Sequence, residues 1–247
     1  MPRASRVFCR GFVWHITHRC HQKKFLLKFA RDRRRWRHWL FEARRRYRLC
    51  VLNYIATSNH IHLLVVDQGN REIATSMQLI AGRTAQEYNR RKKRKGAFWE
   101  DRYHATAVQT DHHLIRCLNY IDLNMVRADV VCHPREWEIS GFHEIQSPRQ
   151  RKGIIDHKTL CELVGISTVE RLKHAHNDWI ADALMKSRRD PVWTESAAVG
   201  DEYFLANLKA QLGPKSMHRQ IRYADDVMCL NEDDIPYAPL SGSKDAD

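Results

Sequence analysis

The sequence predicts an α+β fold of the ferredoxin-like kind, an antiparallel sheet with helices on one face and a helical appendage at the C-terminus. Three observations predict it. Four segments have the alternation or β-branched composition of strands, two segments between them carry apolar residues at helical spacing, and the order is strand, helix, strand, strand, helix, strand. With 247 residues and 43% hydrophobic content, the chain is long enough to bury a core.

Each predicted strand and helix is supported by features of its own segment. The expected elements are strand 11–19, helix 32–47, strands 49–57 and 60–66, helix 71–91 and strand 103–109. Trp36, Leu40 and Ala43 recur at helical spacing in the first helix, and Ile73, Met77 and Ile80 do so in the second. Ser58-Asn59 favours a turn, so the two strands around it should form a hairpin. Asp111 is the expected cap of a further helix that continues to about Asp129.

The chain is expected to have two parts. Residues 1–146 should form one domain, because the strand and helix pattern ends there. Residues 147–247 should form a helical extension that begins with the linker-like segment 147–153, contains helical patterns at 157–187 and 201–212, and ends in an acidic tail from Asp225.

The positive charge is concentrated in the first part. Residues 1–152 contain 31 Lys/Arg and 13 Asp/Glu, a net charge of +18, whereas the remaining 11 Lys/Arg and 16 Asp/Glu give −5. Such an excess favours a polyanion, and in particular nucleic acid, as the partner. No apolar run has the length of a membrane span, and the seven cysteines lack any C-x-x-C pair, which indicates reduced thiols in the cytoplasm.

His60 and His62 bracket one aliphatic residue in a predicted strand. Alternate side chains of a strand project to the same face, so the two imidazoles should lie side by side and could chelate one divalent metal. A polar strand face with two solvated histidines is the alternative reading of such a pair. Only the other residues near the two histidines can distinguish a metal site from a solvated pair.

Tyr120 and Asn124 could supply a nucleophile and a further ligand to such a metal site. They are four residues apart on the predicted helix and therefore lie on one face. A tyrosine hydroxyl can attack a phosphodiester when a metal withdraws charge from the phosphate. The Asn124 amide oxygen could complete a site begun by His60 and His62, and such mixed ligands suit Mg²⁺ or Mn²⁺.

With these residues the chain resembles the HUH single-tyrosine (Y1) transposases, and most closely the REP-associated tyrosine transposases, bacterial relatives of the IS200/IS605 enzymes. The matching segments are His60-Ile61-His62, Tyr120 to Ala128, His15 to Arg19, Ala56 to Leu64 and Phe98 to His104. The C-terminal segment Trp193 to Gly200 also resembles segments in longer members. The similarity runs from about residue 10 to 145 and more weakly to about 225. Proline usually follows the motif asparagine in this family, whereas here the residue is Met125, which permits a regular helix.

The resemblance implies a metal-dependent single-stranded DNA endonuclease and strand transferase that acts on palindromic, REP-type hairpins. His60, His62 and Asn124 would bind Mg²⁺ or Mn²⁺, and Tyr120 would form a 5′-phosphotyrosine intermediate. The enzyme would act in the bacterial cytoplasm at the nucleoid, as a monomer or homodimer, without contact to a membrane. The basic residues expected to contact DNA are Arg33, Arg34, Arg35, Arg45, Arg90, Arg91, Lys92, Lys93, Arg94, Lys95 and Arg102.

Two alternatives stay open. The chain could be a non-catalytic nucleic-acid-binding protein that regulates such repeats, because a basic surface serves binding and cleavage equally. It could also be a relaxase or replication-initiator type of HUH nuclease, although it lacks the helicase P-loop pattern of the initiators.

Overall fold

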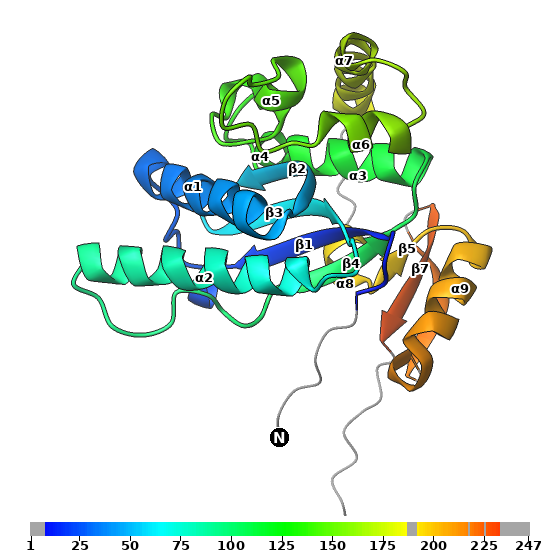
Figure 1. Ribbon diagram of the computed structural model, residues 1–247, viewed down its shortest axis with the longest axis horizontal. Coiled ribbons are helices and arrows are strands. Elements are labelled where there is room, and N and C mark those ends of the chain that lie inside the picture. Colours follow the sequence, from blue (N-terminus) through cyan, green and yellow to red (C-terminus); the bar gives the residue numbers. More distant parts are fainter. Residues whose placement is uncertain (1–7, 187–191, 217, 225, 233–247) are drawn as a thin grey trace, which may run out of the picture.

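The computed structural model describes residues 8–186, 192–216, 218–224 and 226–232. Within these ranges a seven-stranded sheet has the strand order β2-β3-β1-β4-β5-β7-β6 (Figure 1). Helices from both halves of the chain surround it. None of the helices described is both long and apolar enough to span a lipid bilayer.

The first half of the chain has the predicted elements in the predicted order. They are β1 (Val13–Arg19), α1 (Ala30–Tyr47), β2 (Cys50–Ala56), β3 (His60–Val66), α2 (Glu72–Arg91) and β4 (His104–Val108). β3 pairs with both β1 and β2, and β1 pairs with β4, all antiparallel. The ferredoxin-like arrangement and the β2–β3 hairpin are therefore confirmed.

The sheet separates two layers of side chains. α1 and α2 pack against each other and form one core with the sheet, in which Trp36, Leu40 and Ile73 are buried together with Ile16 and Leu63. Burying each such side chain contributes about 1.5–3 kcal/mol. The neighbouring positions of the same strands project to the opposite face. There the side chains meet the helix that follows β4.

The helix after β4 is interrupted, unlike the continuous helix predicted to about Asp129. α3 (His112–Asp122) begins at Asp111, whose side chain accepts a hydrogen bond from the His113 N–H as the predicted cap. Leu123 leaves the helical conformation, and the short α4 (Asn124–Arg127) follows. At the interruption the Tyr120 carbonyl accepts a hydrogen bond from the Arg127 guanidinium, a side-chain partner in the last turn of the helix.

The C-terminal half adds strands as well as the predicted helices. Its regular elements are α5 (Phe142–Gln146), α6 (His157–Leu163), α7 (Val169–Lys186), α8 (Val192–Glu195), β5 (Ala198–Val199), α9 (Glu202–Leu212), β6 (Arg219–Ala224) and β7 (Val227–Glu232). Short 3₁₀ turns occupy His21–Lys23, Pro134–Glu136 and Gly213–Ser216.

Strands β5 to β7 join the sheet of the first half. β5 runs parallel to β4, with Ala107 opposite Ala198, and β7 continues the sheet to β6. Among the elements foreseen for this half, the helices at 157–187 and 201–212 are confirmed as α6, α7 and α9. The three strands were not predicted. Of the acidic tail, positions 225 and 233–247 lie outside the described residues.

The close approach of Gly141 to β2 allows a test by substitution. Its N–H donates to the Tyr54 carbonyl at 2.6 Å, and a Cβ at Gly141 would lie 2.1 Å from the Asn53 side-chain oxygen and 3.1 Å from the Tyr54 backbone nitrogen. We expect Gly141→Ala to lower the free energy of unfolding by about 1–3 kcal/mol, because backbone atoms would have to shift. Urea unfolding followed by circular dichroism measures this loss.

Gly82 provides the matched control. It lies inside α2, and nothing stands within 4 Å of the position that a Cβ would take. We expect Gly82→Ala to stabilise the protein by about 0.4–1 kcal/mol, since alanine restricts the unfolded chain. Equal effects of the two substitutions would contradict the close approach at Gly141.

Candidate active site

Two histidines lie side by side on β3, as the strand periodicity predicted. The ring centroids of His60 and His62 are 4.9 Å apart and the ring planes are inclined by 82°. His62 is buried and His60 is half-buried. Both project to the face of the sheet that α3 covers, opposite to Ile61 and Leu63.

Tyr120 lies against the histidines from the last turn of α3. Its ring centroid is 5.6 Å from that of His62 and 5.9 Å from that of His15, both in edge-on orientation. The Arg127 guanidinium carbon lies 4.3 Å from the centre of the Tyr120 ring. A cation in this position is attracted to the ring face, and it adds positive charge beside the tyrosine.

Asn124 reaches the same place from α4. Its amide nitrogen is 2.9 Å from Nε2 of His62. The interruption at Leu123 does not carry Asn124 away from the histidines, and Met125 is 4% exposed and packs into the core. The structure therefore brings together all four residues that the sequence suggested for catalysis and metal binding.

These residues line one open cavity of about 750 Å³. Arg19, Arg102 and Arg127 also line it, as do the carboxylates Glu100 and Asp101. The C-terminal half contributes Ala183, Leu184 and Thr194 to its wall. Three guanidinium groups beside a tyrosine make a surface that suits a phosphodiester.

The surroundings keep the histidines of the site uncharged. Burial and the positive charge of Arg19 lower the pKa of His60 to about 4, although a hydrogen bond with Asn124 opposes this. Burial lowers the pKa of His62 well below 6.5, and the neighbouring His60 and His15 add to the effect. Burial likewise lowers the pKa of His15 to about 3. A neutral imidazole is the form that can ligate a metal.

The donor atoms fit a divalent cation. The Asn59 amide nitrogen donates to the Lys23 carbonyl, so the amide oxygen of Asn59 faces Nδ1 of His60, 2.7 Å away, and accepts a hydrogen bond from the Nδ1–H of His60. Nε2 of His60 then carries the lone pair. Within the described residues no cluster of three or more His, Cys, Asp or Glu side chains could hold a metal, so the available set is two imidazoles and the Asn124 amide.

The basic residues proposed for DNA contact lie in different surroundings. Arg102 lines the cavity. Arg33 is buried: its guanidinium donates to the carbonyls of Leu27 and Lys28 and lies 4.3 Å from the centre of the Trp137 ring. The other predicted DNA contacts on α1 are exposed and ion-paired: Arg34 pairs with Glu138, Arg35 with Glu87 and Arg45 with Glu42.

The basic run that ends α2 is partly tied to its surroundings. Arg91 pairs with Asp32, and Arg94 donates to the Asn89 side chain and to the Ala97 carbonyl. Lys92 lies 5.5 Å from the centre of the Phe29 ring. The remaining members of the run, Arg90, Lys93 and Lys95, are exposed.

For several residues of the site the sequence suggested no role. Arg19 lies directly opposite His60 in the β1–β3 pairing, and Arg127 follows Tyr120 by seven residues, so strand pairing and helical spacing could have indicated them. His15 and Trp193 also border Tyr120, with the Trp193 ring centroid 6.4 Å from that of Tyr120. No local pattern links these two residues, which are 178 positions apart.

Comparisons with known proteins bear on the family and the fold. The family described as "Transposase IS200 like" matches residues 10–124. The structure of a REP-associated tyrosine transposase bound to a REP hairpin has 17% sequence identity and a TM-score of 0.50, covering 60% of this chain and 87% of that one. It confirms the fold. No curated protein sequence matches the chain.

A weaker likeness connects the chain to a crystal structure of a candidate transposase from Deinococcus radiodurans R1. The sequence identity is 12% and the TM-score 0.34, with 52% of this chain and 97% of that one covered. This likeness is too slight to support an argument.

We expect the metal-free protein to lose stability as the pH falls from about 6.5 toward about 4. Histidines of the unfolded chain bind protons near pH 6.5, whereas His60 and His15 stay neutral until about 4 and about 3. The unfolded state therefore binds more protons in this window, and the free energy of unfolding falls with the pH. Urea unfolding at several pH values measures the slope.

Replacing the half-buried His60 and an exposed histidine tests whether His60 contributes to this slope. His60→Gln should make the slope shallower, because it removes one group that titrates differently in the two states. His174→Gln, at an exposed position of α7, is the matched control. Equal slopes in the wild type and His60→Gln would contradict the assignment.

Proposed function

Because residues 10–124 match the family described as "Transposase IS200 like", we propose that the chain cleaves and rejoins single-stranded DNA at the site around Tyr120. One observation carries this proposal. The Tyr120 ring lies against His62, the neighbour of His60, and Asn124 contacts His62 in the same cavity. A nucleophile and a set of metal ligands thus face one space that is open to a substrate.

A divalent cation, Mg²⁺ or Mn²⁺, would be held by His60, His62 and the Asn124 amide oxygen. When bound, it supplies charge withdrawal from the phosphate of the substrate. The ligands reach this site in the required form: both histidines are neutral, and Nε2 of each is the nitrogen available for coordination.

Tyr120 acts as the nucleophile of the proposed reaction. Its hydroxyl oxygen forms a bond to phosphorus, the bond from phosphorus to the 3′ oxygen breaks, and the proton lost by the phenol is balanced by the one gained by the 3′ oxygen. The product is a 5′-phosphotyrosine and a free 3′-hydroxyl. Attack by another 3′-hydroxyl reverses the step and rejoins a strand without an external energy source. Arg127, above the Tyr120 ring, favours the charge that develops there.

The proposed substrate is a hairpin of a REP-like palindrome. The similar structure is of a transposase bound to a REP hairpin, which supports this choice. Residues 1–152 carry the positive charge that binding phosphates requires. We assign phosphate contact to the exposed basic residues of α1 and of the 90–95 run and to Arg102, and leave out Arg33, which holds the segment before α1.

We also propose a division of the chain, a cellular location and an oligomeric state. Residues 1–146 contain the nucleophile, the ligands and most of the basic excess, so we propose that they form the catalytic domain and that residues 147–247 extend it. The enzyme would act on DNA in the bacterial cytoplasm at the nucleoid, as a monomer or homodimer.

Tyr120→Phe tests the nucleophile. We expect the variant to form no covalent adduct with a labelled REP-like hairpin strand in Mn²⁺, because phenylalanine lacks the attacking oxygen. Denaturing gel electrophoresis of strands labelled at either end detects the adduct and shows which end it carries. Tyr203→Phe, at a tyrosine that is 81% exposed on α9, is the matched control and should behave as the wild type. An undiminished adduct in Tyr120→Phe would exclude this tyrosine.

His60→Ala and His62→Ala test the metal ligands. We expect each to reduce cleavage by at least about 100-fold, since loss of an outer contact to a ligand alone costs about 10–100-fold. Hairpin affinity, measured by fluorescence anisotropy, should change little. His174→Ala is the exposed control. Binding by the wild type without cleavage of any hairpin strand would instead favour the non-catalytic regulator.

A further inference from the structure

His15 lies behind His62 and contacts it directly. It belongs to β1, is fully buried, and its ring is parallel to that of His62 within 9°, with the centroids 5.0 Å apart. Nε2 of His15 is 2.9 Å from Nδ1 of His62. Nδ1 of His15 is 2.9 Å from the Trp193 carbonyl oxygen. A single chain of hydrogen bonds therefore joins a backbone carbonyl of α8 to the metal-facing histidine.

The chemistry of these atoms fixes where the protons are. A carbonyl oxygen can only accept, so Nδ1 of His15 donates to Trp193. A fully buried ring between a carbonyl and another imidazole stays neutral, because burial disfavours the charged form. Nε2 of His15 then carries a lone pair and accepts a hydrogen bond from the Nδ1–H of His62. Nε2 of His62 is left with its lone pair directed at Asn124.

We propose that His15 is a positioning residue: held by the Trp193 carbonyl, it fixes the tautomer and ring orientation of His62 so that Nε2 of His62 faces the metal. The inference rests on the proposed function, because it assigns His62 as a ligand. A hydrogen bond to the second nitrogen of a ligating histidine sets its tautomer and raises its basicity.

His15 is placed as an outer partner rather than as a third ligand. Both of its ring nitrogens are engaged, one by Trp193 and one by His62. Turning the ring toward the cavity would break both bonds and leave a buried carbonyl with one partner fewer. His15 is also absent from the residues that line the cavity.

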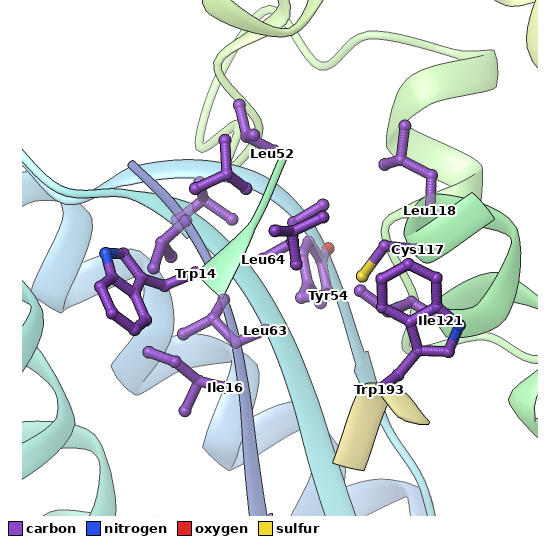
Figure 2. Close-up of a cluster of buried hydrophobic side chains, with 14 of the residues drawn as sticks. Trp14, Ile16, Leu52, Tyr54, Leu63, Leu64, Cys117, Leu118, Ile121 and Trp193 are labelled. Atoms are coloured by element: carbon purple, nitrogen blue, oxygen red, sulfur yellow. The ribbon is translucent and has the colours of Figure 1, made fainter. Parts of the chain in front are cut away.

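The Trp193 carbonyl, which ends this chain of hydrogen bonds, is itself held firmly in place. The Trp193 side chain is 0% exposed, and Figure 2 shows it beside Cys117 and Ile121 of α3. Thr106 of β4, directly opposite His15 in the β1–β4 pairing, lies with its hydroxyl 3.2 Å from the Trp193 carbonyl and 2.6 Å from that of Ser196. The segment around α8 is thus part of the site although it lies in the C-terminal half.

His60 has an outer partner of another kind. Its Nδ1 meets Asn59 and Thr57 in the adjoining β2–β3 turn. The two histidines therefore present Nε2 to the same space through independent supports, one local and one from the distant α8. Removing His15 should affect His62 and leave the support of His60 intact.

The test begins with the metal-free full-length protein. Two-bond ¹H–¹⁵N spectra of histidine-labelled protein distinguish the tautomers, with His62→Gln and His15→Gln used for assignment. We expect both His15 and His62 to carry the proton on Nδ1. A His62 protonated on Nε2 would overturn the inference, and this readout requires neither metal nor DNA.

Affinity for Mn²⁺ alone gives the second readout. We expect His15→Phe to weaken Mn²⁺ binding by about 10–100-fold, measured by electron paramagnetic resonance. His15→Gln should restore most of it, because a glutamine amide can donate to Trp193 or accept from His62. Unchanged affinity in a folded His15→Phe, or equal loss in both variants, would overturn the positioning role. If His15→Phe does not fold, the wild-type tautomers and His15→Gln still decide.

The two proposals fail differently. A wild type that binds no Mn²⁺ and forms no DNA adduct, yet shows the expected tautomers, would overturn the proposed function and with it the purpose of the hydrogen-bond chain. A wild type that binds Mn²⁺ and cleaves DNA but has the other tautomer of His62 would overturn the inference alone.

Discussion

The antiparallel pairing of β1 with β3 determines which side chains share the face toward α3. Thr17 lies opposite His62, and Arg19 lies opposite His60. Since side chains alternate along a strand, a shift of one residue would exchange the histidines with Ile61 and Leu63. These two residues are almost fully buried in the core with α1 and α2. The apolar packing on one face therefore holds the polar geometry on the other.

Much of the first half could be predicted because its signals are local. A strand places His60 and His62 together within three residues, and one helical turn places Asn124 near Tyr120. The approach of β3 to α3 is a tertiary contact that spacing cannot show, and only the family resemblance indicated it. The interruption at Leu123 also escaped prediction, because no proline or glycine marks it.

Other features were missed for different physical reasons. Arg33 stands in a run of arginines, yet it follows the spacing of the buried Trp36, Leu40 and Ala43 along α1, so its position on the helix indicated burial although its charge did not. β5 consists of two residues, too few for any alternation. The contact of His15 with Trp193 depends on how the two halves of the sheet meet. The resemblance pointed to the segments that contain them, but no spacing along the chain indicates that the two residues touch.

The hydrogen bond from His15 to the Trp193 carbonyl has a consequence for the order in which the protein becomes complete. During synthesis, the strands of the ferredoxin-like sheet and Tyr120 leave the ribosome well before residue 193 does. Contacts between residues 178 positions apart also form late in folding, since a long loop must close first. A nascent or truncated chain would therefore contain Tyr120, the proposed nucleophile, before His62 is held. Under the proposed function, full activity would arise only once the segment around Trp193 has been made.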